Sequence, residues 1–231
     1  MRFRLTYEGE LRPTQRDAFP SEPDKLALHK HTIRRVFHKQ MKRLWETNRF
    51  LRDYRTSPNN YNVANPTHPV AQRSIAQESP GFFGGGPDDS IPLLEAIAMQ
   101  PDNHAFGYRF VPLIRDGIAL LCSLDILFLR RDIPGSVIQA GDIDNRIKTL
   151  IDALRRPIHH NEMPSGTEPQ SDDDPFFCLL ADDKYISHFA VETDTLLDPI
   201  TTDTSDQRQV KLVITVELRP YHVTNFTLAF A

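Results

Sequence analysis

The residues best able to do chemistry lie in one short stretch, GDIDNRIKTLIDAL, from Gly141 to Leu154. Asp142 and Asp144 are two positions apart, Asn145 follows directly, and Lys148 comes one helical turn after Asp144. Two carboxylates this close repel one another unless a proton or a cation lies between them. Oxygen ligands of this kind suit Mg²⁺ or Mn²⁺. The stretch therefore indicates a candidate divalent-metal site.

A helix is expected to carry these residues. Asp144, Lys148 and Asp152 are spaced by four, so they stack along one face of a helix. Asp142 stands before the first full turn, where a carboxylate can also cap free backbone N–H groups. The simpler interpretation is therefore a helix cap at Asp142 and a surface ion pair between Asp144 and Lys148. The neighbouring face is a buried stripe at helical spacing, made of Ile143, Ile147, Leu150, Ile151 and Leu154.

A second acidic motif, Ala181-Asp182-Asp183, lies further along the chain and precedes Tyr185-Ile186. The order and spacing of these residues in the two motifs together resemble the pattern of the RusA-type Holliday-junction resolvases. The resemblance covers roughly residues 108 to 219. That family is typically smaller, and it has a glycine-bearing turn where this chain has Ala181. The residues that carry the resemblance are Asp142, Asp144, Asn145, Lys148, Asp152, Leu154, Asp182 and Asp183.

The resemblance implies an α/β fold, with a mixed sheet of about four to six strands and two helices packed on it. It implies a Mg²⁺-dependent endonuclease acting on branched DNA, with Mn²⁺ as a substitute ion. Asp142, Asp144 and Asp183 would hold the metal, with Asp182 ranked behind Asp183. Lys148 would contact the phosphate as a fixed charge, Asn145 would orient a ligand or water, and Asp152 would be structural. A homodimer would place two such sites on opposite strands of a four-way junction.

A basic helix is expected from about Asp24 or Leu28 to Tyr54, although the net charge of the 231-residue chain is −4. The segment from Asp24 to Thr56 contains ten Lys or Arg residues and three acidic residues. Such a basic stripe is typical of a surface that contacts nucleic-acid phosphates. A solvated face on a core-packed helix is the alternative. The candidate DNA-contacting residues are Arg34, Arg35, Lys39, Lys42 and Arg43.

A single domain spanning residues 1–231 is the default for this length. Relative to the smaller family it would carry insertions at about 57–105 and 157–175 and an extension at 220–231. The insertions are candidate contacts for a further protein partner, and the extension is a candidate edge strand or subunit contact. No apolar run has the length of a membrane span, and the N-terminal residues do not form a signal peptide. We therefore expect a cytoplasmic protein, bacterial or phage-encoded.

The remaining apolar segments predict strands at about 2–11, 108–114, 118–131, 185–193 and 209–219. Asp116-Gly117 suits a tight hairpin turn between the second and third of these. The nearly continuous apolar run at 118–131 predicts a central strand covered on both faces. Asp125 interrupts it, and either belongs to the site or faces solvent. A short helix is expected within 90–99.

Two other function classes remain open. A RusA-like fold could serve as a nucleic-acid-binding or assembly module without turnover. The chain could also be an unrelated α/β binding protein whose 142–155 helix is a salt-bridged core helix. Mg²⁺-dependent cleavage that is lost on substitution of Asp144 would separate the enzyme from both.

Overall fold

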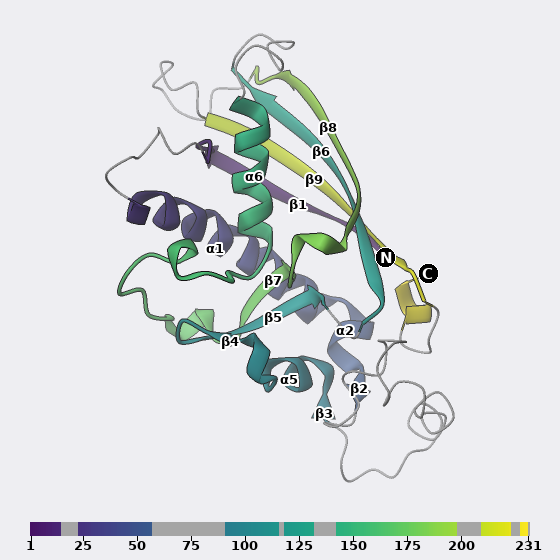
Figure 1. Ribbon diagram of the computed structural model, residues 1–231. Helices are drawn as coiled ribbons and strands as arrows, with labels where there is room; N and C mark the ends of the chain where they lie inside the picture. Colours follow the sequence, from purple (N-terminus) through teal and green to yellow (C-terminus); the bar gives the residue numbers. More distant parts are fainter. Residues whose placement is uncertain are drawn as a thin grey trace.

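A four-stranded mixed sheet, with helices on one side of it, positions the candidate residues (Figure 1). The structure, a computed structural model, describes residues 1–14, 23–56, 91–115, 118–131, 142–197, 209–222 and 227–230. β9 pairs antiparallel with both β1 and β6, and β8 pairs parallel with β6. The fold is therefore of the mixed α/β class that the sequence predicts. The strand order is β1 (Arg2–Glu10), β9 (Gln209–Pro220), β6 (Leu120–Arg130) and β8 (Ile186–Thr195).

Two amphipathic helices supply the apolar layer that covers this sheet. α1 (Pro23–Thr47) buries Ile33, Phe37, Met41 and Trp45, which recur every four residues and so share one face. α6 (Asp142–Leu154) buries the expected stripe, although Ile151 is only partly covered. In the sheet, Leu5 lies opposite Ile214, which lies opposite Ile126, and all three are buried in the same core. The prediction of the 142–155 helix is confirmed.

A smaller sheet lies next to α1 and contains β4 (His104–Ala105), β5 (Tyr108–Ile114) and β7 (Phe176–Leu180). β5 pairs parallel with β7. The predicted hairpin between β5 and β6 is therefore wrong, because these strands belong to different sheets. The expected turn residues, Asp116 and Gly117, lie outside the described residues, and Ala119 just after them has a left-handed φ of 53°. Pairing with β7, a strand contributed from far along the sequence, takes precedence over the local turn signal.

The remaining elements connect these layers. The segment expected to form one basic helix forms two, α1 and α2 (Arg49–Asp53). Asn48 separates them, because its side chain caps α2 by accepting a hydrogen bond from the Leu51 N–H. β2 (Arg55–Thr56) pairs with β3 (Ile91–Pro92), and the expected short helix follows as α5 (Leu93–Ala98). The rest of the 57–105 insertion, residues 57–90, lies outside the described residues.

The end of the chain packs into the core. The 3₁₀ turn Thr227–Phe230 buries Phe230, whose ring lies 5.3 Å from that of Phe50. The Met1 ammonium group donates a 2.7 Å hydrogen bond to the Phe230 carbonyl oxygen, so the two ends of the chain lie together (Figure 1). Residues 227–230 therefore do not form the edge strand that was one expectation for the extension.

β6 is central in its sheet, as expected, but it is not covered on both faces. Asp125 is exposed, and its Oδ1 atom lies 3.4 Å from Nε2 of His188 on β8. Leu121, Leu127 and Leu129 on the same face are only half-buried. Of the two expectations for Asp125, the solvent-facing one is therefore correct. None of the helices in the described ranges combines the length and apolar character needed to span a bilayer.

Two histidines on α1 make the stability of the fold depend on pH. Burial lowers the pKa of both His29 and His31 to about 4. His31 packs between the rings of Tyr108 and Phe176, and its Nδ1 has no hydrogen-bond partner among the described residues. In an unfolded chain the same groups would have a pKa near 6.5. The stability that they contribute is thus fully present above about pH 6.5 and is lost as the pH falls toward 4.

We predict that the urea midpoint falls between pH 7 and pH 5, and that His31→Phe reduces this fall. The phenyl ring keeps the aromatic contacts but cannot take up a proton. The measurement is equilibrium unfolding followed by the fluorescence of the buried Trp45. An unchanged pH dependence in the variant would contradict this assignment for His31.

Candidate functional site

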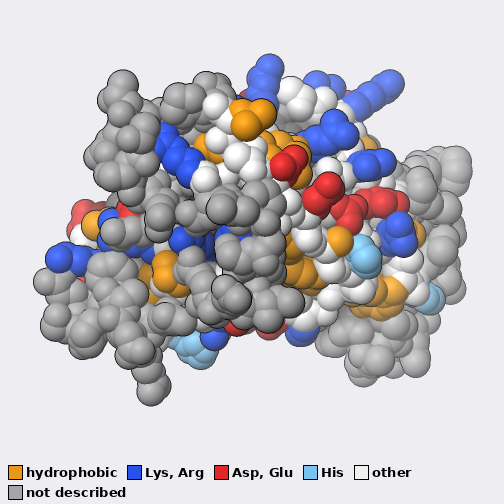
Figure 2. All heavy atoms as spheres, turned by 90° about the horizontal axis from the view of Figure 1, so that it is seen from above, with side chains coloured by type: hydrophobic (Ala, Val, Ile, Leu, Met, Phe, Trp, Pro, Cys, Tyr) orange, Lys and Arg blue, Asp and Glu red, His pale blue; other side chains and the backbone are white. Residues whose placement is uncertain are grey.

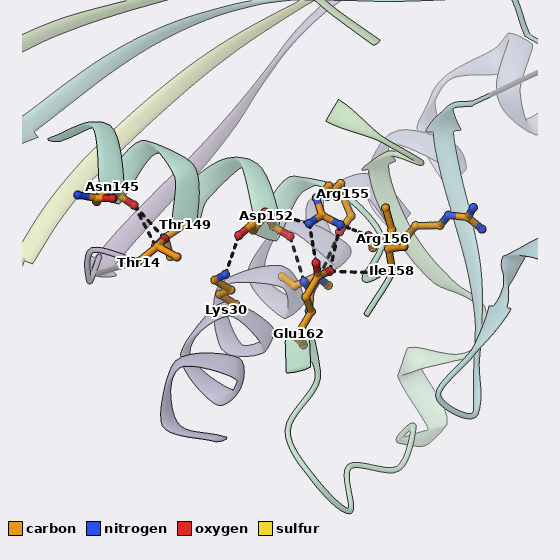
Figure 3. A network of polar contacts seen from close by, with 10 residues as sticks. Thr14, Lys30, Asn145, Thr149, Asp152, Arg155, Arg156, Ile158 and Glu162 are labelled. Atoms are coloured by element: carbon orange, nitrogen blue, oxygen red, sulfur yellow. Dashed lines mark hydrogen bonds and ion pairs between the residues drawn. The ribbon is translucent and has the colours of Figure 1, made fainter. Parts of the chain in front are cut away.

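The first acidic group lies in the first turns of α6. Asp144 and Lys148 are both exposed and stand one turn apart, whereas the side chain of Asp142 lies outside the described residues. Thr14 fixes this end of the helix, because its N–H and Oγ1 both lie within hydrogen-bond distance of the Asn145 carbonyl oxygen, at 3.3 and 3.1 Å. The hydroxyl of Thr14 also lies 2.7 Å from that of Thr149 (Figure 3). Asp144 and Lys148 are therefore presented to solvent from an anchored helix end.

The second acidic group follows the end of β7. The Ala181 N–H donates to the Ile114 carbonyl oxygen at 2.8 Å, which extends the β5–β7 pairing by one residue. Asp182 then caps the 3₁₀ turn Asp183–Tyr185, its Oδ1 accepting from the Lys184 N–H at 3.0 Å. Asp182 is half-buried and Asp183 is exposed. The sequence motif therefore forms a short acidic turn at the end of a buried strand.

The surroundings of Asp182 lower the pKa of its carboxyl group. The Lys184 backbone N–H is the main cause that lowers the pKa of Asp182, and partial burial opposes it. A hydrogen bond with the side chain of Asp183 lowers that pKa further, as do the charges of Lys184 and Arg155. Two adjacent carboxylates on one short turn repel each other and so favour a cation between them. Asp182 and Asp183 therefore form an acid pair.

The structure does not bring the two acidic groups together. Asp144 stands ten residues before the end of α6 at Leu154, about 15 Å along the helix axis at 1.5 Å per residue. The acid pair lies beside the other end, because the N–H of Arg156 donates to the Leu180 carbonyl oxygen at 2.9 Å. Figure 1 shows the turn that leads into β8 next to this end of α6.

The expected convergence of Asp142, Asp144 and Asp183 is therefore not observed. The described part of the chain contains no group of three or more His, Cys, Asp and Glu residues that could hold a metal ion. The direction of β7 explains why the two acidic groups are separated. Leu180 forms a parallel bridge with Arg155, so β7 runs in the same direction as the chain that leaves α6. The acid pair is thereby delivered to the C-terminal end of the helix.

A buried ionic network joins the end of α6 to α1 and to the segment 157–175 (Figure 3). Asp152 accepts from Lys30 at 2.6 Å and from Arg155 at 3.0 Å. Arg155 also donates to both carboxylate oxygens of Glu162, at 2.7 and 3.0 Å. All four side chains are buried. Asp152 is therefore structural, as expected.

Arg34 belongs to this buried region and is not accessible to a DNA phosphate, which contradicts its place among the candidate DNA-contacting residues. Its side chain is only 1% exposed, and its guanidinium donates to the carbonyl oxygens of Asp152 and Arg155 at 3.0 and 3.3 Å. It thus caps the negative end of the α6 dipole. Burial lowers the pKa of Arg34 to about 10.

The other basic residues of α1 divide into two groups. Arg35 is half-buried, donates a hydrogen bond to Gln170 and lies 3.5 Å from a carboxylate oxygen of Asp173. Lys39 and Arg43 are exposed, and Lys42 is half-buried. Figure 2 shows that on the face seen from above, Lys and Arg side chains are interspersed with Asp and Glu. Of the five candidate residues, Lys39, Lys42 and Arg43 therefore keep their side chains at the surface of α1.

Comparisons with protein-family models, curated proteins and solved structures find no match to this chain.

Sequence reasoning did not single out Arg155 and Glu162. Lys, Arg, Glu and Asp are almost never fully buried unless they are paired, so a charged residue in a polar segment is expected at the surface. The three-residue spacing of Asp152 and Arg155 was the one available signal, because such residues are neighbours on a helix. Nothing in the sequence links either residue to Glu162.

Arg34 and Lys39 are expected to respond differently to truncation. Arg34→Ala should lower the free energy of unfolding by about 3 kcal/mol, because it leaves carbonyl groups unpaired and disturbs a buried ionic network. Lys39→Ala should change it by less than about 0.5 kcal/mol, as is usual at exposed positions. Urea unfolding of both variants measures the difference. Equal, small losses would contradict a structural role for Arg34.

Proposed function

We propose that this protein is a divalent-cation-dependent endonuclease that hydrolyses phosphodiester bonds in branched DNA. The observation that carries the proposal is the acid pair, in which Asp182 and Asp183 are adjacent on one short turn and the Lys184 N–H holds the carboxylate of Asp182 in place. Such a pair at the end of a buried strand suits an oxygen-liganded cation. The motif order from Asp142 to Asp183 gives the proposal its substrate class.

The acid pair fits Mg²⁺ or Mn²⁺ in the type of its donor atoms. Asp182 and Asp183 would hold the ion, whereas Asp142 and Asp144, which the sequence motif places in the ligand set, stand at the other end of α6 and are too far away to bind the same ion. A bound divalent cation lowers the pKa of coordinated water and neutralises charge on phosphate oxygens.

The side chains around the acid pair have roles of their own in this scheme. The Lys184 N–H and the nearby charge of Arg155 keep Asp182 ionised, because both lower its pKa. Lys148 offers an exposed ammonium group to a phosphate, and Lys39, Lys42 and Arg43 would track the DNA backbone. We include a homodimer in the proposal, because cutting both strands of a junction needs two sites.

Cleavage of a four-way junction and of linear duplex DNA in Mg²⁺ tests the proposal. We expect junction cleavage by the wild-type protein and its loss in Asp183→Asn with DNA binding retained, whereas Asp144→Asn, whose side chain lies at the other end of α6, should still cut. The neutral amide removes the negative charge that a cation needs while it conserves the shape of the side chain. Gel-based cleavage and fluorescence anisotropy report the two properties separately.

Asp172→Asn is the matched control, since Asp172 is exposed and is joined to His38 only through its carbonyl oxygen. It should cut as the wild type does. Loss of cutting in Asp144→Asn would show that the acid pair alone is not the site. Equal cutting by Asp183→Asn would contradict the proposal.

A second candidate is a nucleic-acid-binding or assembly module without turnover. The separation of Asp144 from the acid pair along α6 favours it, because two distant acidic groups do not form one catalytic centre. It predicts junction binding that is independent of Mg²⁺ and unchanged in both aspartate variants, with no cleavage by the wild type.

A further inference from the structure

We propose that Glu162 is a positioning residue, which holds the acid pair of Asp182 and Asp183 in place through Arg155. This inference rests on the proposed cation site. It assigns a role to the segment 157–175, for which the smaller family offers no counterpart. Glu162 would touch neither the cation nor the DNA.

The first step concerns the backbone that leads into the acid pair. On one side, the Ala181 N–H donates to the carbonyl oxygen of Ile114 at the end of β5. On the other side, the Leu180 carbonyl oxygen accepts from the N–H of Arg156 at 2.9 Å. The second contact lies two residues before Asp182. The location of residues 155–156 therefore sets where the acidic turn begins.

The second step concerns what holds residues 155–156. The Arg155 guanidinium binds both oxygens of Glu162, one oxygen of Asp152 and the carbonyl oxygen of Arg156. The two-point contact with Glu162 fixes the direction of the planar guanidinium as well as its distance. Figure 3 shows Glu162 facing Arg155 from the loop below the helix end.

The third step is the burial of this contact. Glu162 is 7% exposed and Arg155 is 9% exposed, so neither charge can turn to solvent when its partner is removed. Glu162 also accepts from the Ile158 N–H at 3.0 Å and thereby folds the segment 158–162 over the helix end. Removing its charge leaves Asp152 as the one carboxylate of the network for both Arg155 and Lys30, so one buried positive charge is uncompensated, which is costly. The guanidinium and the adjoining backbone would then shift, and the acid pair would shift with them.

The test compares Glu162→Gln with the wild-type protein. We expect the Mn²⁺ affinity, measured by isothermal titration calorimetry, to fall about 10-fold, as is typical when a group that supports a ligand is lost. Hydrogen exchange, measured by NMR, should become faster at the amides of Arg156 and Ala181. This second readout does not depend on a bound metal ion.

Asp173→Asn is the matched control. Asp173 lies in the same segment and is buried to 2% exposure, but its carboxylate contacts Arg35 and the Gln170 N–H. It should lose stability in urea, yet keep wild-type Mn²⁺ affinity and wild-type exchange at Arg156 and Ala181. A fall in affinity that is specific to Glu162→Gln separates positioning from general destabilisation.

The possible failures are distinct. If Glu162→Gln leaves both exchange and affinity unchanged, or if Asp173→Asn alters them equally, the positioning role is overturned. If the wild type does not bind Mn²⁺, the proposed cation site fails, and exchange at Arg156 and Ala181 still decides whether Glu162 positions the acidic turn.

Discussion

The arrangement of this protein depends on the contact between Arg155 and the two carboxylates that flank it, Asp152 and Glu162. Three elements meet there: the end of α6, the side of α1 through Lys30, and the segment that leads to β7. Each charge is buried and each has a partner of opposite sign, which is the condition under which buried ions are tolerated. Loss of one member would leave the others charged in an apolar setting.

This network makes α6 a helix that is anchored at both ends. At its beginning, the contacts of Thr14 tie the helix to the segment that follows β1. At its end, Arg34 caps the last carbonyl groups and Arg155 connects to the loop. The exposed face between these anchors carries Asp144 and Lys148, so their backbone positions are well defined although their side chains reach into solvent.

Two acidic groups thus exist where the motif suggests one. The acid pair stands at the end of α6 that the network controls, and Asp144 stands at the opposite end. The expected helix, its buried stripe and the acidic turn before β8 are all present, and only their mutual placement differs. A function that uses the acid pair alone is compatible with this placement. A single centre that also contains Asp144 is not.

Sequence by itself determined the elements whose pattern is local. The periodicity of α6 and α1, the alternation in β1 and β9, and the helix at Leu93–Ala98 follow from short-range apolar spacing, which the core then uses. Only the tertiary structure decided that β5 pairs with β7 instead of β6, that Arg34 is buried, and that Asp183 lies at the far end of the helix from Asp144. These outcomes depend on which distant segment pairs with which, and on a segment, 157–175, whose own sequence has little periodicity. Charge and spacing do not encode such pairings, because the same residues suit a surface or a buried network until their partners are placed.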